Sequence, residues 1–231
     1  NIIFSESFES PVVNVTNYPL FNGDWVNFGT GTPGFMAGSN APVGESFTGD
    51  SGIEWSIPIG NVDLVVDDHL TAAEGVQSLN LNGFEQGAIE ASINFPAIGN
   101  YTLIFALSKN PTGVDVAKLS VTLDSVELLG SPYSYDSSNS AGDMAYRYIS
   151  VNFSVASVGL HSLRFTSLNE GSGFGPMIDD ISISRNIIFS ESFESPVVNV
   201  TNYPLFNGDW VNFGTGTPGF MAGSNAPVGE S

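Results

Sequence analysis

The chain of 231 residues contains no cysteine. It can therefore form neither a disulfide framework nor a thiolate metal site. It also lacks any apolar run close to the roughly 20 residues that cross a bilayer, and it shows no signal peptide. A hydrophobic core, strand pairing or an oxygen-bound metal must hold the fold together, and we expect the chain to be a segment of a longer exported protein.

Basic residues are scarce. Five Lys and Arg stand against 24 Asp and Glu, which gives a net charge of −19 although only 13% of the residues are charged. Such a field repels nucleic acid and anionic membranes and concentrates cations. Salt-adapted proteins are acidic too, but their surfaces are usually densely charged, so we favour a calcium-rich extracellular setting. Neither nucleic acid nor membrane insertion is expected.

Signals for catalysis are few. His69 and His161 are the two histidines, and no nucleophile elbow, HExxH helix or phosphate loop is present. Asp67 and Asp68 are neighbours in sequence, whereas glycosidase carboxyls face each other across a cleft. The sequence does not predict an enzyme.

The N-terminal sequence occurs twice. Asn186–Ser231 repeats Asn1–Ser46 letter for letter. Repetition of this kind is typical of tandem arrays. We therefore expect residues 1–185 to form a complete β-sandwich repeat unit and residues 186–231 to begin the next one.

Apolar residues alternate with polar ones along most of the unit. The clearest series are Ile89, Ala91, Ile93 and Phe95, then Tyr101, Leu103, Phe105 and Leu107, and similar pairs or triplets recur as far as Ile183. Gly or Pro punctuates nearly every gap, and only Asp67–Glu74 looks weakly helical. This pattern predicts an all-β protein, an antiparallel β-sandwich or jelly roll of at least eight short strands. Val12–Ser51 interrupts it with an irregular, aromatic-rich stretch that we expect to fold against the rest.

Several segments together resemble one family. They are Phe8-Glu9, Trp55, Gly60-Asn-Val-Asp63, Gly75, Ser78-Leu-Asn-Leu-Asn-Gly83, Gly87-Ala-Ile89, Gly99-Asn-Tyr101, Phe105, Asn110-Pro111 and Gly175-Pro-Met-Ile-Asp-Asp-Ile-Ser-Ile183. They are similar to choice-of-anchor C and DUF642 domains, galactose-binding-like jelly rolls related to carbohydrate-binding modules. The resemblance implies secretion and attachment to cell-surface or wall polysaccharide. Two departures are the long stretch before Trp55 and Asn80, where the family often has Asp.

The resemblance also implies a structural calcium between the first and last strands. Glu9 and one of Asp179 or Asp180 would supply carboxylates, and backbone carbonyls from the Phe21–Asp24 region, with Asp24 itself, would complete the oxygen shell. The alternative is that these acids are solvated residues at strand ends.

Aromatic residues are the candidates for binding a sugar, because a flat ring complements the apolar face of a pyranose. We single out Trp25, Tyr18, Tyr133 and Tyr135. Trp55 is expected in the core.

Three classes of function stay open: a repeat of a surface adhesin or fibre, a carbohydrate-binding module, and an accessory domain of an enzyme. The repeat favours the first, in which copies of the chain join head to tail by strand exchange. The residues expected to pair with a neighbouring copy are Ile187, Ile188, Phe189, Phe193 and Trp210.

Overall fold

The structure, a computed structural model, describes residues 1–18, 23–30, 42–113, 116–130, 133–171 and 173–187. Residues Asn1–Ile187 form one compact unit. Within the described ranges, no helix is long and apolar enough to cross a membrane.

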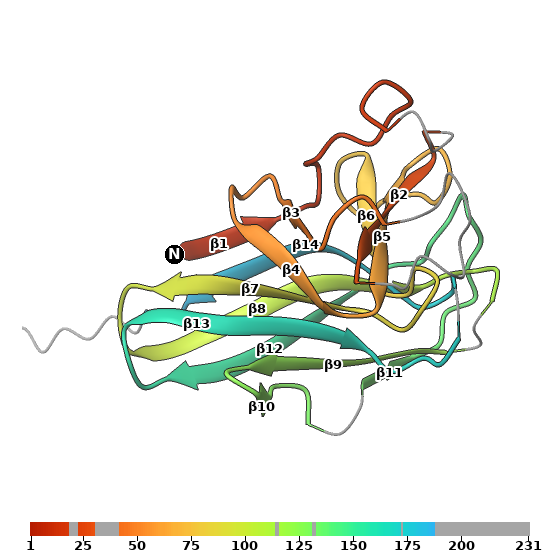
Figure 1. The fold of residues 1–231 in the computed structure, drawn as a ribbon. Coiled ribbons are helices and arrows are strands. Elements are labelled where there is room, and N and C mark those ends of the chain that lie inside the picture. Colours follow the sequence, from red (N-terminus) through yellow and green to blue (C-terminus); the bar gives the residue numbers. More distant parts are fainter. Residues whose placement is uncertain (19–22, 31–41, 114–115, 131–132, 172, 188–231) are drawn as a thin grey trace, which may run out of the picture. The chain divides into compact units, whose positions relative to one another are not determined.

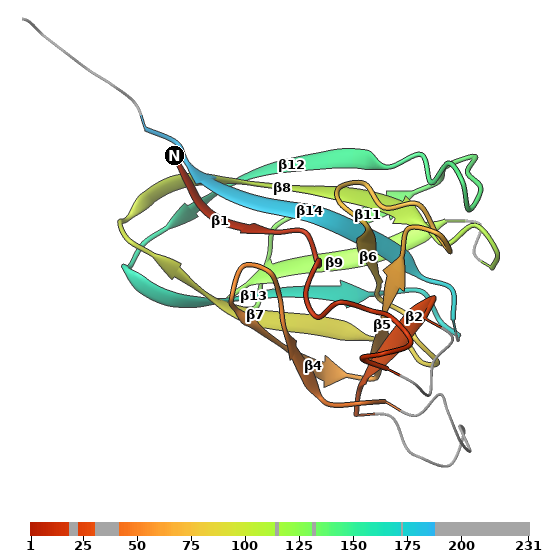
Figure 2. The same cartoon turned by 90° about the horizontal axis from the view of Figure 1, so that it is seen from above.

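The unit consists of two seven-stranded antiparallel sheets that face each other (Figures 1 and 2). The first sheet has the order β12-β8-β14-β6-β5-β2, with β1 also paired to β14, and the second has the order β10-β9-β13-β7-β4-β3, with β11 also paired to β9. The strands of the first sheet are β1 (Ile2–Glu6), β2 (Trp25–Gly29), β5 (Asn61–Val66), β6 (Gln77–Asn80), β8 (Gly99–Lys109), β12 (Arg147–Val155) and β14 (Pro176–Arg185). Those of the second are β3 (Ser46–Thr48), β4 (Glu54–Ile59), β7 (Ala88–Phe95), β9 (Ala117–Leu123), β10 (Val126–Glu127), β11 (Tyr133–Tyr135) and β13 (Gly159–Ser167).

The alternating residues form the inner faces of the two sheets. Leu103 and Phe105 of β8 are fully buried, as are Phe95 of β7 and Phe165 of β13. Phe105 and Phe165 meet across the sandwich with ring centroids 5.2 Å apart. The predicted β-sandwich is thus confirmed, and the core lies where the period-two pattern placed it.

Trp55 is at the centre of the aromatic core, as expected. It is 0% exposed, and its ring lies 6.2 Å from Phe4 and 6.1 Å from Phe8. Its indole Nε1 donates a hydrogen bond of 3.0 Å to buried Glu6. The first strand is therefore tied to the second sheet through side chains as well as to β14 through its backbone.

Two expectations about local structure need correction. Val12–Ser51 contains β2 and β3, so the irregular stretch supplies a strand to each sheet. The segment 67–74 is formed by turns and bends, not helix. Gly60 allows the crossing from β4 to β5, because its φ is +52° and a Cβ there would lie 2.1 Å from the Gln86 carbonyl oxygen.

Candidate functional site

A row of polar residues crosses the outer face of the first sheet. Asn27 of β2 lies opposite Asp63 of β5, and Asp63 in turn lies opposite Asn80 of β6. Their sequence neighbours Val26, Leu64 and Leu79 point into the core. Strand pairing thus brings together three polar side chains that are far apart in the sequence.

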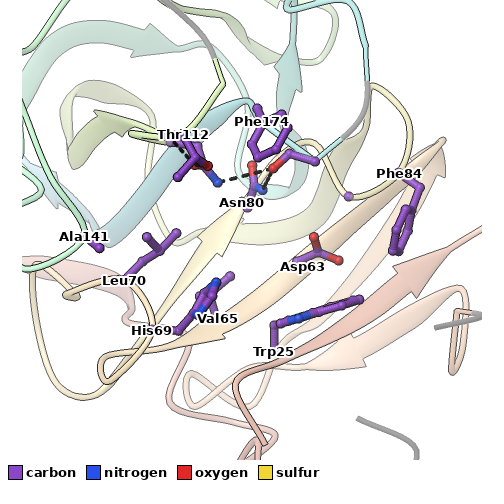
Figure 3. Close-up of a pocket in the computed structure, with 13 residues that line it drawn as sticks. Trp25, Asp63, Val65, His69, Leu70, Asn80, Phe84, Thr112, Ala141 and Phe174 are labelled. Carbon is purple, nitrogen blue, oxygen red and sulfur yellow. Dashed lines mark hydrogen bonds between the residues drawn. The ribbon is translucent and has the colours of Figure 1, made fainter. Parts of the chain in front are cut away.

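Loops rise around this row and enclose a hollow of about 240 Å³ (Figure 3). The residues that line it are Trp25, Asp63, Val65, His69, Leu70, Asn80, Gly83, Phe84, Asn110, Thr112, Ala141, Gly173 and Phe174. The volume is below the 300–1,000 Å³ typical of pockets for drug-sized ligands. The hollow therefore suits a ligand of about the size of one sugar ring.

Asp63 is the acidic group of the hollow. Its side chain is buried, and burial raises the pKa of the carboxyl to about 7, although a hydrogen bond from Asn27 opposes the rise. Asn27 Nδ2 donates to Asp63 Oδ1 at 2.7 Å, the one hydrogen bond that the carboxyl accepts from the described residues. The group can therefore offer an acceptor or, when protonated, a donor to a bound hydroxyl.

Two carboxamides position the loop that closes the hollow. Asn80 and Asn110 both donate to the carbonyl oxygen of Gly173, at 3.0 and 3.2 Å. Asn110 Oδ1 accepts from the hydroxyl of Thr112 at 2.7 Å. These bonds fix the backbone next to Phe174, so the polar wall is organised before any ligand arrives.

Aromatic side chains form the other walls. Trp25 and Phe84 are tilted against each other with ring centroids 5.7 Å apart. Phe174 is 41% exposed, and Figure 3 shows it above Asn80, on the far side of Asp63 from Trp25. Flat rings beside a carboxyl and carboxamides complement both surfaces that a sugar ring presents, its C–H face and its hydroxyls.

Of the four aromatic residues predicted to bind sugar, Trp25 alone lines this hollow. Tyr18 packs edge-on against Phe28 at 6.3 Å, and burial raises its pKa. Tyr133 and Tyr135 lie on β11 and pack against the core, and the hydroxyl of Tyr135 donates to the Ala145 carbonyl.

Asp63 and Asn80 were noted in the sequence only as part of the family resemblance, and Phe84 and Phe174 were not singled out as binding residues. Asp63 and Asn80 occupy polar positions within apolar strands, which was a usable signal. Phe84 and Phe174 come from loops and gave none.

Glu9, Asp179 and Asp180, three of the residues proposed for calcium, make hydrogen bonds within the protein. Glu9 Oε1 and Asp179 Oδ2 each accept two hydrogen bonds, at 2.8–3.0 Å, from backbone N–H groups of residues 73–77. Burial raises the pKa of Asp179 to about 7. Asp180 accepts from a tyrosine hydroxyl, and the described residues contain no cluster of three or more acids or histidines. Backbone amides thus bind Glu9 Oε1 and Asp179 Oδ2, and a calcium ion at this place stays a prediction.

His161 lies in a triad-like arrangement with Asp124 and Ser157. Its Nδ1 is 2.5 Å from Asp124 Oδ2, and its Nε2 is 2.9 Å from the Ser157 carbonyl oxygen and 3.5 Å from the Ser157 hydroxyl. Since the carbonyl can only accept, Nε2 carries a proton and is unable to take one from the serine. The contacts raise the pKa of His161, foremost the one with Asp124. The group is an ion pair that joins two hairpin turns.

The predicted assembly residues lie at the end of the described chain. Ile187 is 62% exposed. Ile188, Phe189, Phe193 and Trp210 are outside the described residues.

Comparison with known families assigns the chain. The family described as "Protein of unknown function (DUF642)" matches residues 27–184, and the chain belongs to this family. No curated protein matches the sequence.

Solved structures of similar fold include several carbohydrate-binding modules. A family 35 module from Clostridium thermocellum is 18% identical with a TM-score of 0.43, over 57% of this chain and 92% of that one. The CBM22-1 xylan-binding domain of Paenibacillus barcinonensis Xyn10C is 16% identical with a TM-score of 0.42, over 82% of this chain and 97% of that one. The C-terminal CBM6 of LamC, a laminarinase of Zobellia galactanivorans, is 23% identical with a TM-score of 0.35, over 49% and 83%. At such identities and TM-scores, no ligand is transferred to this chain.

Proposed function

We propose that this chain is a carbohydrate-binding β-sandwich unit that acts outside the cell and has no catalytic activity of its own. The observation that carries the proposal is the hollow in which Trp25, Phe84 and Phe174 surround Asp63 and Asn80. Aromatic faces supply contact area for the C–H face of a sugar, and the carboxyl and carboxamides supply directed hydrogen bonds. An extracellular role agrees with the acidic composition, which suits a calcium-rich setting.

The charge of the hollow selects among sugars. None of its lining residues is Lys or Arg, and Asp63 is its one carboxyl. Above about pH 7, where Asp63 is ionised, a uronate or other anionic sugar would bring a second negative charge, and His69 is the one basic residue in the lining; such a charge is unfavourable in a partly enclosed site. We therefore propose a neutral sugar ring, either single or at the end of a chain.

The repeated sequence suggests that several weak sugar sites could act together. Each copy of residues 1–46 carries one tryptophan: Trp25, which lines the hollow, and Trp210, its counterpart in the second copy. An array of such units on one surface protein would bind a polysaccharide many times at once, so that modest single-site affinity suffices for adhesion.

Binding to neutral and anionic polysaccharides tests this function. We expect the full chain to bind at least one of xylan, β-1,4-galactan or mannan, as measured by calorimetry and affinity electrophoresis, and to bind polygalacturonate more weakly. Phe84→Ala should weaken binding by roughly 5- to 150-fold, because stacking and burial of one ring contribute about 1–3 kcal/mol. Asp63→Asn should also weaken it, since a carboxamide replaces the charged acceptor.

Tyr148→Ala is the matched control for loss of an aromatic ring. Tyr148 is 54% exposed and lies outside the hollow, so its removal should leave affinity unchanged. Binding that survives Phe84→Ala and Asp63→Asn, or that is lost equally in the control, would place the sugar elsewhere.

A further inference from the structure

The described strand residues of the first copy, residues 1–46, pair with residues outside it. Within residues 1–46, β1 pairs with β14 and β2 pairs with β5, and Ser46, the first residue of β3, pairs with Ser56 of β4. None of these partner strands belongs to the copied segment. Residues 47–185, here called the body, therefore contain every strand that the segment needs.

Side chains of the segment depend on the body as well. Phe4 and Phe8 are buried against Trp55. The carboxyl of Glu6 accepts hydrogen bonds from the Asp50 backbone, at 3.1 Å, and from the Ser51 hydroxyl. A copy of this segment without a body would expose these apolar rings to water, which is strongly unfavourable.

The seam between body and copy has the geometry for exchange. The end of β14 lies beside the chain start, since the Arg185 N–H donates to the Asn1 carbonyl at 2.9 Å, and Ile2 pairs with Ser184. Ile187 is the copy of Ile2, and it follows Ser184 by three residues. Arg185 and Asn186 would then form a two-residue turn, the commonest connection between antiparallel strands.

Residues 47–231 consequently hold the same sequence as residues 1–185 in permuted order, joined without a gap. The chain contains one body and two identical segments that fit it.

We propose that residues 186–231 bind the same surface of the body that residues 1–46 occupy, along β14, β5 and β4. The segment seats either on its own body, which releases the first copy, or on the body of a second copy of this chain. A released segment keeps its full set of strands and buried rings for another body. This surface is thus an interface for self-assembly, whatever the ligand of the hollow.

Cysteine pairs in the full chain test the proposal, because the chain has no other cysteine. Ser5 and Ser182 lie directly opposite on β1 and β14, at a spacing suited to a disulfide. In the double variant Ser182→Cys/Ser190→Cys, the second substitution falls on the copy of Ser5. We expect this variant to form a disulfide in on the order of half the molecules, because two identical segments compete for one place.

The variant Ser5→Cys/Ser182→Cys measures the occupancy of the first copy under the same conditions, and Ser182→Cys alone shows how much disulfide forms without the pairing. A second pair uses the other end of the segment. Ser46 lies opposite Ser56 on β3 and β4. The variant Ser56→Cys/Ser231→Cys therefore measures how often the second copy occupies the body, and Ser46→Cys/Ser56→Cys measures how often the first copy does.

Products are separated on non-reducing gels and sized by mass spectrometry. A disulfide within one chain shows exchange in place, and one between chains shows assembly; both support the proposal. The copy does not use this surface if the Ser190→Cys and Ser231→Cys pairs are oxidised no further than the single-cysteine background while the original pairs form their disulfides.

Discussion

Replacing Asp63 by Asn tests the hollow through stability. The carboxyl is buried with its pKa raised to about 7, well above the usual 3.8. Asparagine has nearly the same shape and can still accept the hydrogen bond from Asn27. The substitution therefore removes the buried charge and little else.

The direction of the effect follows from proton binding. The unfolded chain releases the Asp63 proton near pH 3.8, whereas the folded chain keeps it until about pH 7. Between these values the folded state binds more protons, so this group lowers the free energy of unfolding as pH rises and its effect levels off above pH 7. The rise of the Asp63 pKa from 3.8 to about 7 corresponds to on the order of 4 kcal/mol.

We expect a smaller gain because water that enters the hollow screens the charge. Asp63→Asn should be more stable than the wild type by about 1–3 kcal/mol at pH 8, with a melting midpoint higher by about 2–4 °C for each kcal/mol. At pH 5 the two proteins should be nearly equal, because Asp63 is then protonated. Urea unfolding at both pH values measures the difference, and the exposed Asp68→Asn is the control.

Glu6 and Asp179 also have pKa values raised to about 7, chiefly by burial. Their contributions are common to wild type and variant and cancel in the difference. A variant that is less stable at both pH values, or equally more stable at both, would refute the assignment of a buried charge to Asp63.

Two further predictions concern the ends of the sandwich. If calcium binds near Glu9 and Asp179, a hundredfold excess over its Kd raises the free energy of unfolding by about 2.7 kcal/mol. The melting midpoint with calcium should then be higher than the midpoint with chelator. Equal midpoints would mean that the amide contacts of residues 73–77 link the strands without a metal. The second prediction concerns His161. Its raised pKa contributes stability that is complete below pH 6.5 and is lost as the pH rises through the raised pKa. The lowered pKa of Asp124 contributes stability that is lost as the pH falls through that lowered pKa. His161→Gln should therefore reduce the midpoint most near pH 5–6 and least at pH 9, and a loss independent of pH would contradict the ion pair.

The sequence predicted the sandwich because the strands that build it have one buried and one open face. β7 and β9 alternate in burial along their length, which is the signal that period-two patterns report. β2 and β5 gave no such signal, since loops cover their outer faces and nearly every residue is buried. The strands closest to the hollow were thus the hardest to foresee.

The site was predictable only in part for a related reason. Trp25 could be chosen for its chemistry and its setting among glycine and aspartate. The row of Asn27, Asp63 and Asn80 exists because β5 lies between β2 and β6, and pairing between distant strands is not written in local sequence. Phe84 and Phe174 reach the hollow from loops whose course depends on the same pairing.

The hollow and the surface of the body that binds the copied segment are coupled, because the segment contributes a residue to the hollow. Trp25 belongs to the copied segment, whereas Asp63, Asn80, Phe84 and Phe174 belong to the body. A body whose segment has left would lack one aromatic wall of the site, and a body that takes up the copy would regain it through Trp210. A sugar that contacts both parts binds the seated state more tightly than the open one, so by linkage it must also strengthen the hold of the segment on the body. Under the two proposals made for this chain, sugar binding therefore strengthens the hold of whichever copy is seated, whether on its own body or on that of a second chain.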